Sequence, residues 1–170
     1  MTDMRPTLSA ADPYLSLAGR IVPGGHVLPL RVYYEDTDFT GIVYHANYLK
    51  FMERGRSDHL RLIGVNQSEL FGQALEEAPG FAFVVRSLSI DYLRPARFDD
   101  VLEVHTSPSE VAGASITLHQ KVMRDKELLV EAKVKVAFIS QGRARRIPDA
   151  LRAAMKATQE EAARQGARPD

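Results

Sequence analysis

Segment 34–48 concentrates residue types that can act as a nucleophile, a base or an orienting group. It carries three acids, among them Asp36 and Asp38, and then His45. A carboxylate can attack a carbonyl carbon or draw a proton from water, and an imidazole can orient or assist it. Gly41 permits a tight or left-handed backbone between them. The pattern favours a polar loop that could act on an electrophilic substrate.

This loop ends where a helical pattern begins, next to His45. The first backbone N–H groups of a helix lack intrahelical acceptors, and the helix dipole is positive at that end. Such an end can hold an anion or stabilise a developing oxyanion. The sequence therefore allows a nucleophile or base beside a helix end that activates an electrophile.

Periodicity and breakers predict the elements that position the loop. We expect strands over 27–35, 81–92, 101–106, 114–124 and 128–140, helices over 46–62 and 66–77, and a terminal helix from Pro148. Gly64 is the predicted stop of the long helix, and Gly55 near its middle predicts close packing on a sheet. The later connections are too short for parallel crossovers. We therefore expect an antiparallel sheet packed on one long helix, an α+β fold.

The chain of 170 residues suits one main domain. Residues 1–26 hold several prolines and the Gly24-Gly25 pair without a sustained period, so we expect a poorly ordered N-terminal arm. Residues 27–148 are the expected domain, and residues 149–170 the expected C-terminal helix and tail.

Composition argues against several classes of protein. Lys plus Arg and Asp plus Glu are both 22, and this balance argues against a nucleic-acid binder. There is no cysteine, hence no disulfide, thiolate zinc site or cysteine nucleophile. The longest apolar run, 81–85, is far shorter than the roughly 20 residues of a membrane span, and residues 1–25 lack the apolar core of a secretory signal. A cytoplasmic location fits these features.

The polar residues also have structural explanations. Asp36 and Asp38 are of a type that bonds nearby backbone N–H groups in turns, and His45 could be an exposed helix residue. Together with Glu35 they match no known metal-binding spacing. His59 lies on the apolar helix face, where a bonded core or interface group is expected.

The segment resembles the signature of hotdog-fold acyl-CoA thioesterases of the 4-hydroxybenzoyl-CoA thioesterase type, in the branch associated with the Tol–Pal system. The pattern is met at Asp36, Asp38, Gly41, Val43, Tyr44, His45, Asn47 and Tyr48. Similarity continues in 51–54 and 90–96 and covers about residues 27–148. The resemblance implies a sheet wrapped around one long helix and hydrolysis of an acyl-CoA thioester without metal or cofactor. It also implies a homodimer or homotetramer with active sites at the subunit interface.

Carried onto this chain, the resemblance implies Asp38 as nucleophile or general base. The helix N-terminus at His45 would polarise the thioester carbonyl, and the His45 imidazole could assist. Glu53 is the rival acid, because another hotdog branch carries its carboxylate on the helix; we expect it to be a paired surface group instead.

Substrate contacts are expected at Gly41, Val43 and Tyr44, and an acyl pocket at Phe39, Val43, Phe51, Phe81 and Phe83. Arginine suits phosphate recognition, so Arg94 and Arg97 are the first candidates for the CoA phosphates, followed by Arg143, Arg145 and Arg146.

Two other functions stay open at this point. A non-catalytic scaffold that binds acyl-CoA or acyl-carrier protein, near the inner membrane, would not need the acids and histidine together. A hotdog dehydratase would need a His-Phe-Pro-Gly type segment, which the sequence lacks.

Overall fold

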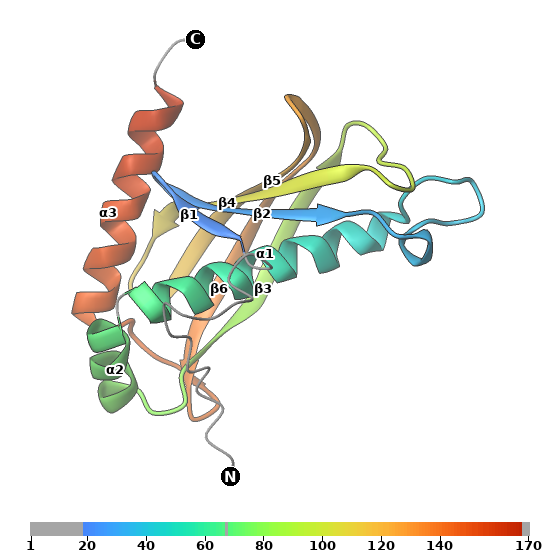
Figure 1. The fold of residues 1–170 in the computed structure, drawn as a ribbon. Helices are drawn as coiled ribbons and strands as arrows, with labels where there is room; N and C mark the ends of the chain where they lie inside the picture. The colour runs from blue at the N-terminus through green and yellow to red at the C-terminus, as the bar shows by residue number, and fades with distance from the viewer. Residues whose placement is uncertain (1–18, 67, 168–170) are drawn as a thin grey trace.

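The computed structural model describes residues 19–66 and 68–167, in which a long helix packs across an antiparallel sheet (Figure 1). The strands are β1 Arg20–Val22, β2 Gly25–Arg31, β3 Ala82–Tyr92, β4 Val101–Val111, β5 Ser115–Arg124, β6 Glu127–Ser140 and β7 Arg143–Ala144. The helices are α1 His45–Asn66, α2 Ser68–Glu77 and α3 Asp149–Gly166. The strand order is β1-β2-β4-β5-β6-β3, with β7 on β6, and all pairs are antiparallel. The predicted α+β architecture is confirmed.

Helix α1 packs against the concave side of the sheet through an apolar face. Phe51 and Met52 are almost fully buried in the same core as Val104 of β4. Burying a side chain of this size contributes roughly 1.5–3 kcal/mol. A Cβ on Gly55 would lie 2.9 Å from Val104 Cγ1 and 3.2 Å from the Thr106 hydroxyl. The close approach of helix and sheet predicted from Gly55 is therefore confirmed.

The predicted N-terminal arm is wrong in its last part. Residues 20–22 form β1 and pair with the start of β2 in a hairpin. Pro23 and Gly24 make its two-residue turn, and Gly24 has a φ of 79°. Proline followed by a glycine of positive φ is the signature of a type II turn. Residues 1–18 lie outside the described residues.

Two helix boundaries differ from prediction. Helix α1 continues through Gly64 to Asn66, because Gly64 keeps a helical backbone beside Phe71 of α2. Helix α2 begins at Ser68, so Asn66 ends one helix and does not open the next.

Two strand boundaries also differ. Strand β2 ends at Arg31, four residues earlier than predicted, because a 3-10 turn occupies Tyr34–Asp36. Strand β4 runs on to Val111, with a bulge between Pro108 and Glu110. A bulge is a position at which a strand tolerates proline.

The terminal helix predicted from Pro148 is confirmed as α3. Leu151 is fully buried in the common core, which fixes α3 to the sheet. Figure 1 shows α3 standing across one end of the sheet, beside α2. Within residues 19–66 and 68–167, no helix combines the length and apolar character of a membrane span.

Candidate active site

Asp36 anchors the loop between β2 and α1. Its carboxylate accepts a hydrogen bond from the Tyr33 N–H at 2.8 Å. Its carbonyl oxygen accepts from the Tyr44 N–H at 2.9 Å and from the Asn47 side-chain amide at 2.8 Å. Asp36 and Asn47 are both buried. These contacts hold the loop against the first turn of α1, which is the supporting arrangement expected for Asp36.

Asp38 is partly exposed in the same loop. Its Oδ1 accepts hydrogen bonds from the N–H of Thr40 at 2.8 Å and from the Thr40 hydroxyl, whereas its Oδ2 has no donor within the described chain. The Thr40 hydrogen bonds, helped by nearby His45, hold the pKa of Asp38 below its ordinary value. One oxygen of an ionised carboxylate is thus oriented and the other is available.

A short turn presents this carboxylate. The Asp38 N–H donates to the Ile42 carbonyl and the Gly41 N–H to the Asp38 carbonyl, each at 3.0 Å. Gly41 has a φ of 81°, which a side chain would strain. Gly41 is also exposed, with open space around the position of a Cβ, so a substrate can approach it.

His45 is the first residue of α1, and its ring is exposed. The ring packs on those of Tyr44 and Tyr92, with centroids 4.6 and 6.1 Å away, and the Tyr92 hydroxyl donates to the His45 carbonyl at 3.1 Å. Within the described residues, the N–H groups of His45 and Ala46 have no hydrogen-bond acceptor. The helix end therefore offers two free donors close to Asp38.

The segment after β3 completes the wall of the loop. The Val43 N–H donates to the Ala96 carbonyl at 2.9 Å, and the Tyr48 hydroxyl accepts from the Ala96 N–H at 2.9 Å. Val43 and Tyr48 are buried to about 97%. Val43 is buried in the core, whereas Tyr44 is 46% exposed beside His45. The substrate contacts expected of both residues stay predictions.

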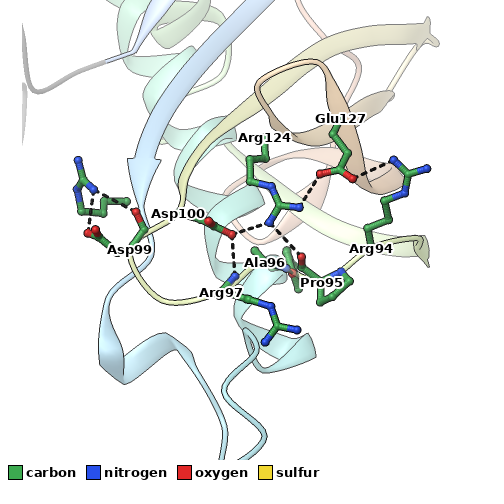
Figure 2. A network of polar contacts seen from close by, with 10 residues as sticks. Arg94, Pro95, Ala96, Arg97, Asp99, Asp100, Arg124 and Glu127 are labelled. Carbon is green, nitrogen blue, oxygen red and sulfur yellow. Dashed lines mark hydrogen bonds and ion pairs between the residues drawn. The ribbon is translucent and has the colours of Figure 1, made fainter.

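A charged network, which the sequence analysis missed, surrounds Arg124 (Figure 2). Its guanidinium donates to Asp100 at 2.7 Å and to Glu127 at 2.5 Å. These bonds raise the pKa of Arg124, and the bond from Arg124 lowers the pKa of Glu127. The network ties the segment after β3 to the β5–β6 hairpin. Charges at positions 100, 124 and 127 gave no periodic signal, because the three meet only in the folded sheet.

The two arginines predicted to meet CoA differ in this network (Figure 2). Arg94 donates to Glu127 at 3.0 Å and is therefore already paired. The backbone N–H of Arg97 donates to Asp100, but its exposed guanidinium has no ion pair in the described part of the chain. The backbone of Arg97 also forms an isolated antiparallel β-bridge with that of Ile42, which places Arg97 beside the loop that carries Asp38.

A cavity of about 220 Å³ lies between α1, α3 and the sheet. Glu53, Arg56 and Ser57 of α1 line it, together with apolar side chains of the strands and Met155 of α3. Glu53 accepts a hydrogen bond from the Ser57 hydroxyl and has no arginine partner among the described residues, contrary to expectation. Asp38 does not line this cavity.

The predicted acyl pocket does not coincide with this cavity, and it stays a prediction. Of its five residues only Phe83 lines the cavity. Phe39 is fully exposed, Val43 and Phe51 are buried in the core, and Phe81 packs on the Phe138 ring at a centroid distance of 5.1 Å. Aromatic type alone did not distinguish core from cavity. No group of three or more acids or histidines within the described residues could hold a metal ion.

Two of the relatives among curated proteins illustrate the similarity. The acyl-CoA thioesterase YbgC of Haemophilus influenzae is 46% identical over 123 residues, which are 72% of this chain and 87% of that protein. The acyl-CoA thioester hydrolase YbgC of Escherichia coli O157:H7 is 41% identical over 112 residues, 65% of this chain and 79% of that protein.

Solved structures of thioesterases are also similar to this chain. A protein of Bartonella henselae described as a "Probable Thioesterase" has a TM-score of 0.62 at 41% identity, covering 74% of this chain and 98% of that one. A gentisyl-coenzyme A thioesterase has a TM-score of 0.64 at 25% identity, covering 76% of this chain and 98% of that one.

The family model described as Thioesterase superfamily matches residues 40–131. With that match over more than half of its length, this chain belongs to the thioesterase superfamily and has its hotdog fold.

Proposed function

We propose that the protein hydrolyses acyl-CoA thioesters to a free acid and CoA, with Asp38 as the acting carboxylate. Relatives at 41–46% identity are acyl-CoA thioesterases, which supports the reaction class. The observation that carries the role of Asp38 is its geometry. An ionised carboxylate with one unengaged oxygen lies within electrostatic reach of His45, the residue at which α1 begins with two free N–H groups.

The chemistry can follow two routes from this arrangement. As a nucleophile, Asp38 attacks the thioester carbon, CoA leaves as its thiolate, and water then hydrolyses the mixed anhydride. As a general base, Asp38 takes a proton from water, the hydroxide adds, and the proton passes to the departing sulfur. Either way the carbonyl oxygen gains negative charge, which the N–H groups of His45 and Ala46 would stabilise; one such donor can contribute roughly 2.7–4 kcal/mol.

Glu53 is the second candidate acid, because it lines the cavity and Asp38 does not. Eight residues of helix separate Glu53 from His45, about 12 Å along the axis. Within one chain, therefore, the cavity begins well away from the helix end. Asp38 and the cavity therefore come together only if one copy of the chain supplies Asp38 and a second copy supplies the cavity.

The free edge of β3 is the surface we propose for that second copy. Within the described residues β3 pairs with β6 alone. Val85, Leu88 and Tyr92 are 53%, 39% and 45% exposed along it. An exposed apolar edge strand is a template for pairing with another chain. Antiparallel pairing of β3 with itself would bring the Tyr92 end of one copy, and with it the His45 corner, to the Phe83 end of the other, where the cavity lies.

Substituting Asp38 tests the proposed mechanism. We expect Asp38→Asn to retain fold and assembly, since Asn can keep the Thr40 hydrogen bonds, and to lower kcat at least about a hundredfold. Glu53→Gln is the matched control and should stay within about threefold of wild type. A thiol-release assay over several acyl-CoAs measures both. Loss in Glu53→Gln with activity kept in Asp38→Asn would transfer the role to Glu53.

The pH profile adds a second measurement to the same test. The Thr40 hydrogen bonds hold the pKa of Asp38 below its ordinary value. Loss of kcat/KM through protonation of Asp38 should therefore set in at a lower pH than it would for an ordinary aspartate. Binding of acyl-CoA by the wild type without thiol release would instead indicate the scaffold function. Tol–Pal association, an acyl-carrier protein partner and a location at the inner membrane stay predictions.

A further inference from the structure

The cavity crosses the sheet beneath the second half of α1. Four successive strands of the sheet form its floor. They contribute Phe83 of β3, Val136 of β6, Leu118 of β5 and Pro108 of β4. Three strand spacings of roughly 4.8 Å make this floor about 14 Å long. It runs from the free edge of β3 toward the end of the sheet where α3 stands.

The roof of the cavity changes character along α1. Glu53, Arg56 and Ser57 make its first part polar, whereas Leu60 and Ile63 make its last part mainly apolar, with His59 between the two parts. A cavity with one polar and one apolar end is complementary to a ligand that joins a polar group to an apolar chain.

Arg56 is a fixed part of the polar end. Its guanidinium donates to the Gln120 side-chain oxygen at 2.9 Å. Gln120 is fully buried and donates in turn to the Met52 carbonyl at 3.0 Å and the Thr106 hydroxyl at 2.8 Å. No carboxylate of the described residues pairs with Arg56 at ion-pair distance. Its remaining donors are therefore free for an acceptor on the ligand.

Helix α3 closes the apolar end. Met155 and Thr158 reach the cavity from this helix. Arg152 holds α3 in place by donating to the Ala112 carbonyl at 3.0 Å, and Gln159 by donating to the Ser109 carbonyl at 3.1 Å. This wall lies beyond residues 40–131, the part that the family model matches.

We propose that this cavity takes a straight, medium-length acyl chain, and that Met155 sets the upper limit of its length. The proposal rests on the proposed function. An apolar cavity of about 150 Å³ holds benzene, a ligand of six carbons, so the cavity of about 220 Å³ has room for roughly nine carbons. The substrate class is therefore the straight-chain acyl-CoA of about six to ten carbons, with its methyl end against Met155.

A chain-length series tests this limit. For wild-type protein, kcat/KM should rise about fourfold per added methylene up to about eight to ten carbons and then fall. Met155→Ala removes three heavy atoms from the wall, so the optimum should move about two carbons longer, with dodecanoyl-CoA gaining at least about tenfold relative to octanoyl-CoA. Met155→Phe should shift the optimum to shorter acyl chains.

Leu151→Ala is the matched control, because Leu151 is one turn earlier on α3 but does not line the cavity. It should lower stability without moving the optimum. An optimum that shifts equally in Leu151→Ala, or that stays unchanged in Met155→Ala and Met155→Phe, overturns the proposal.

Calorimetric binding of octanoyl- and dodecanoyl-CoA separates this proposal from the proposed function, since it needs no turnover. A preference that Met155→Ala shifts toward dodecanoyl-CoA, in a protein that releases no thiol, supports the acyl cavity and refutes the thioesterase. Hydrolysis with no chain-length dependence refutes the cavity and leaves the thioesterase intact.

Discussion

Asp36 and Asp38 are two residues apart and have opposite surroundings. Asp36 is buried and bound to the backbone, whereas Asp38 is partly exposed with one oxygen unengaged. The motif indicated both acids, and the supporting position of Asp36 could be predicted from the sequence. What could not be predicted is the contribution of Thr40, whose two hydrogen bonds orient Asp38, because a hydroxyl two residues away can turn toward or away from a carboxylate.

The two arginines beside the loop lead to a prediction about CoA binding. Arg97→Ala should raise KM for an acyl-CoA about three- to fivefold, because its unpaired guanidinium is available to phosphate. Arg94→Ala is the matched control and should change KM less than about twofold, since Arg94 is paired with Glu127. Steady-state kinetics with acyl-CoA and with the corresponding acyl-pantetheine measure this. An equal effect of Arg97→Ala on both substrates would contradict a phosphate contact.

Among the elements, the long helix and the four long strands were predictable, because their apolar residues recur with clear periods. The β1–β2 hairpin was missed because Pro23 and the paired glycines were interpreted as breakers. The same residues are a turn signature, and only the pairing of Ile21 with His26 distinguishes a hairpin from an arm. That pairing depends on contacts with α1, which a local pattern does not contain.

The hairpin is fixed to α1 by a buried histidine pair. His26 of β2 lies 2.7 Å from the Asp58 carboxylate, and its ring stacks on that of His59 at 5.2 Å. Burial, followed by the charge of His26, lowers the pKa of His59 to about 4. Arg61 and the Gly19 N–H also bind Asp58, so the charge around the pair is largely fixed.

This pair predicts that the protein loses stability in mild acid. Because the folded pKa of His59 lies below the unfolded value of about 6.5, the unfolded state takes up a proton first as the pH falls. The contribution of His59 to the free energy of unfolding should be complete above about pH 6.5 and should decline by about 3 kcal/mol toward pH 4. Urea unfolding at pH 7.5 and 4.5 measures it. His59→Phe should remove the part of the decline that His59 causes and leave the part due to His26, whose pKa burial also lowers. The half-exposed His105→Phe should remove neither part, and an undiminished decline in His59→Phe would refute the assignment.

At the scale of the whole molecule, the sheet has two unequal edges. Strand β1 is three residues long, whereas β3 has eleven residues with exposed apolar side chains. Self-association could be expected from the sequence, since an antiparallel sheet needs its edges covered. The sequence could not predict which edge would be covered, because the strand order follows from pairings between distant segments.

We therefore predict that β3 mediates a dimer. Leu88→Glu places a charge on this edge outside the cavity lining, so the protein should become monomeric in light scattering coupled to size exclusion. It should also lose at least about tenfold in kcat/KM if two copies build each site. Ile21→Glu, an exposed apolar residue of β1, is the control and should keep both assembly and activity. A fully active Leu88→Glu monomer would contradict the shared site.

The closing wall of the cavity comes from the last helix, whereas the loop with Asp38 lies more than a hundred residues earlier. Evolution can therefore vary the two separately. Substitutions, insertions or replacements in α3 would retune which acids a descendant releases, and the inherited reaction would continue unaltered.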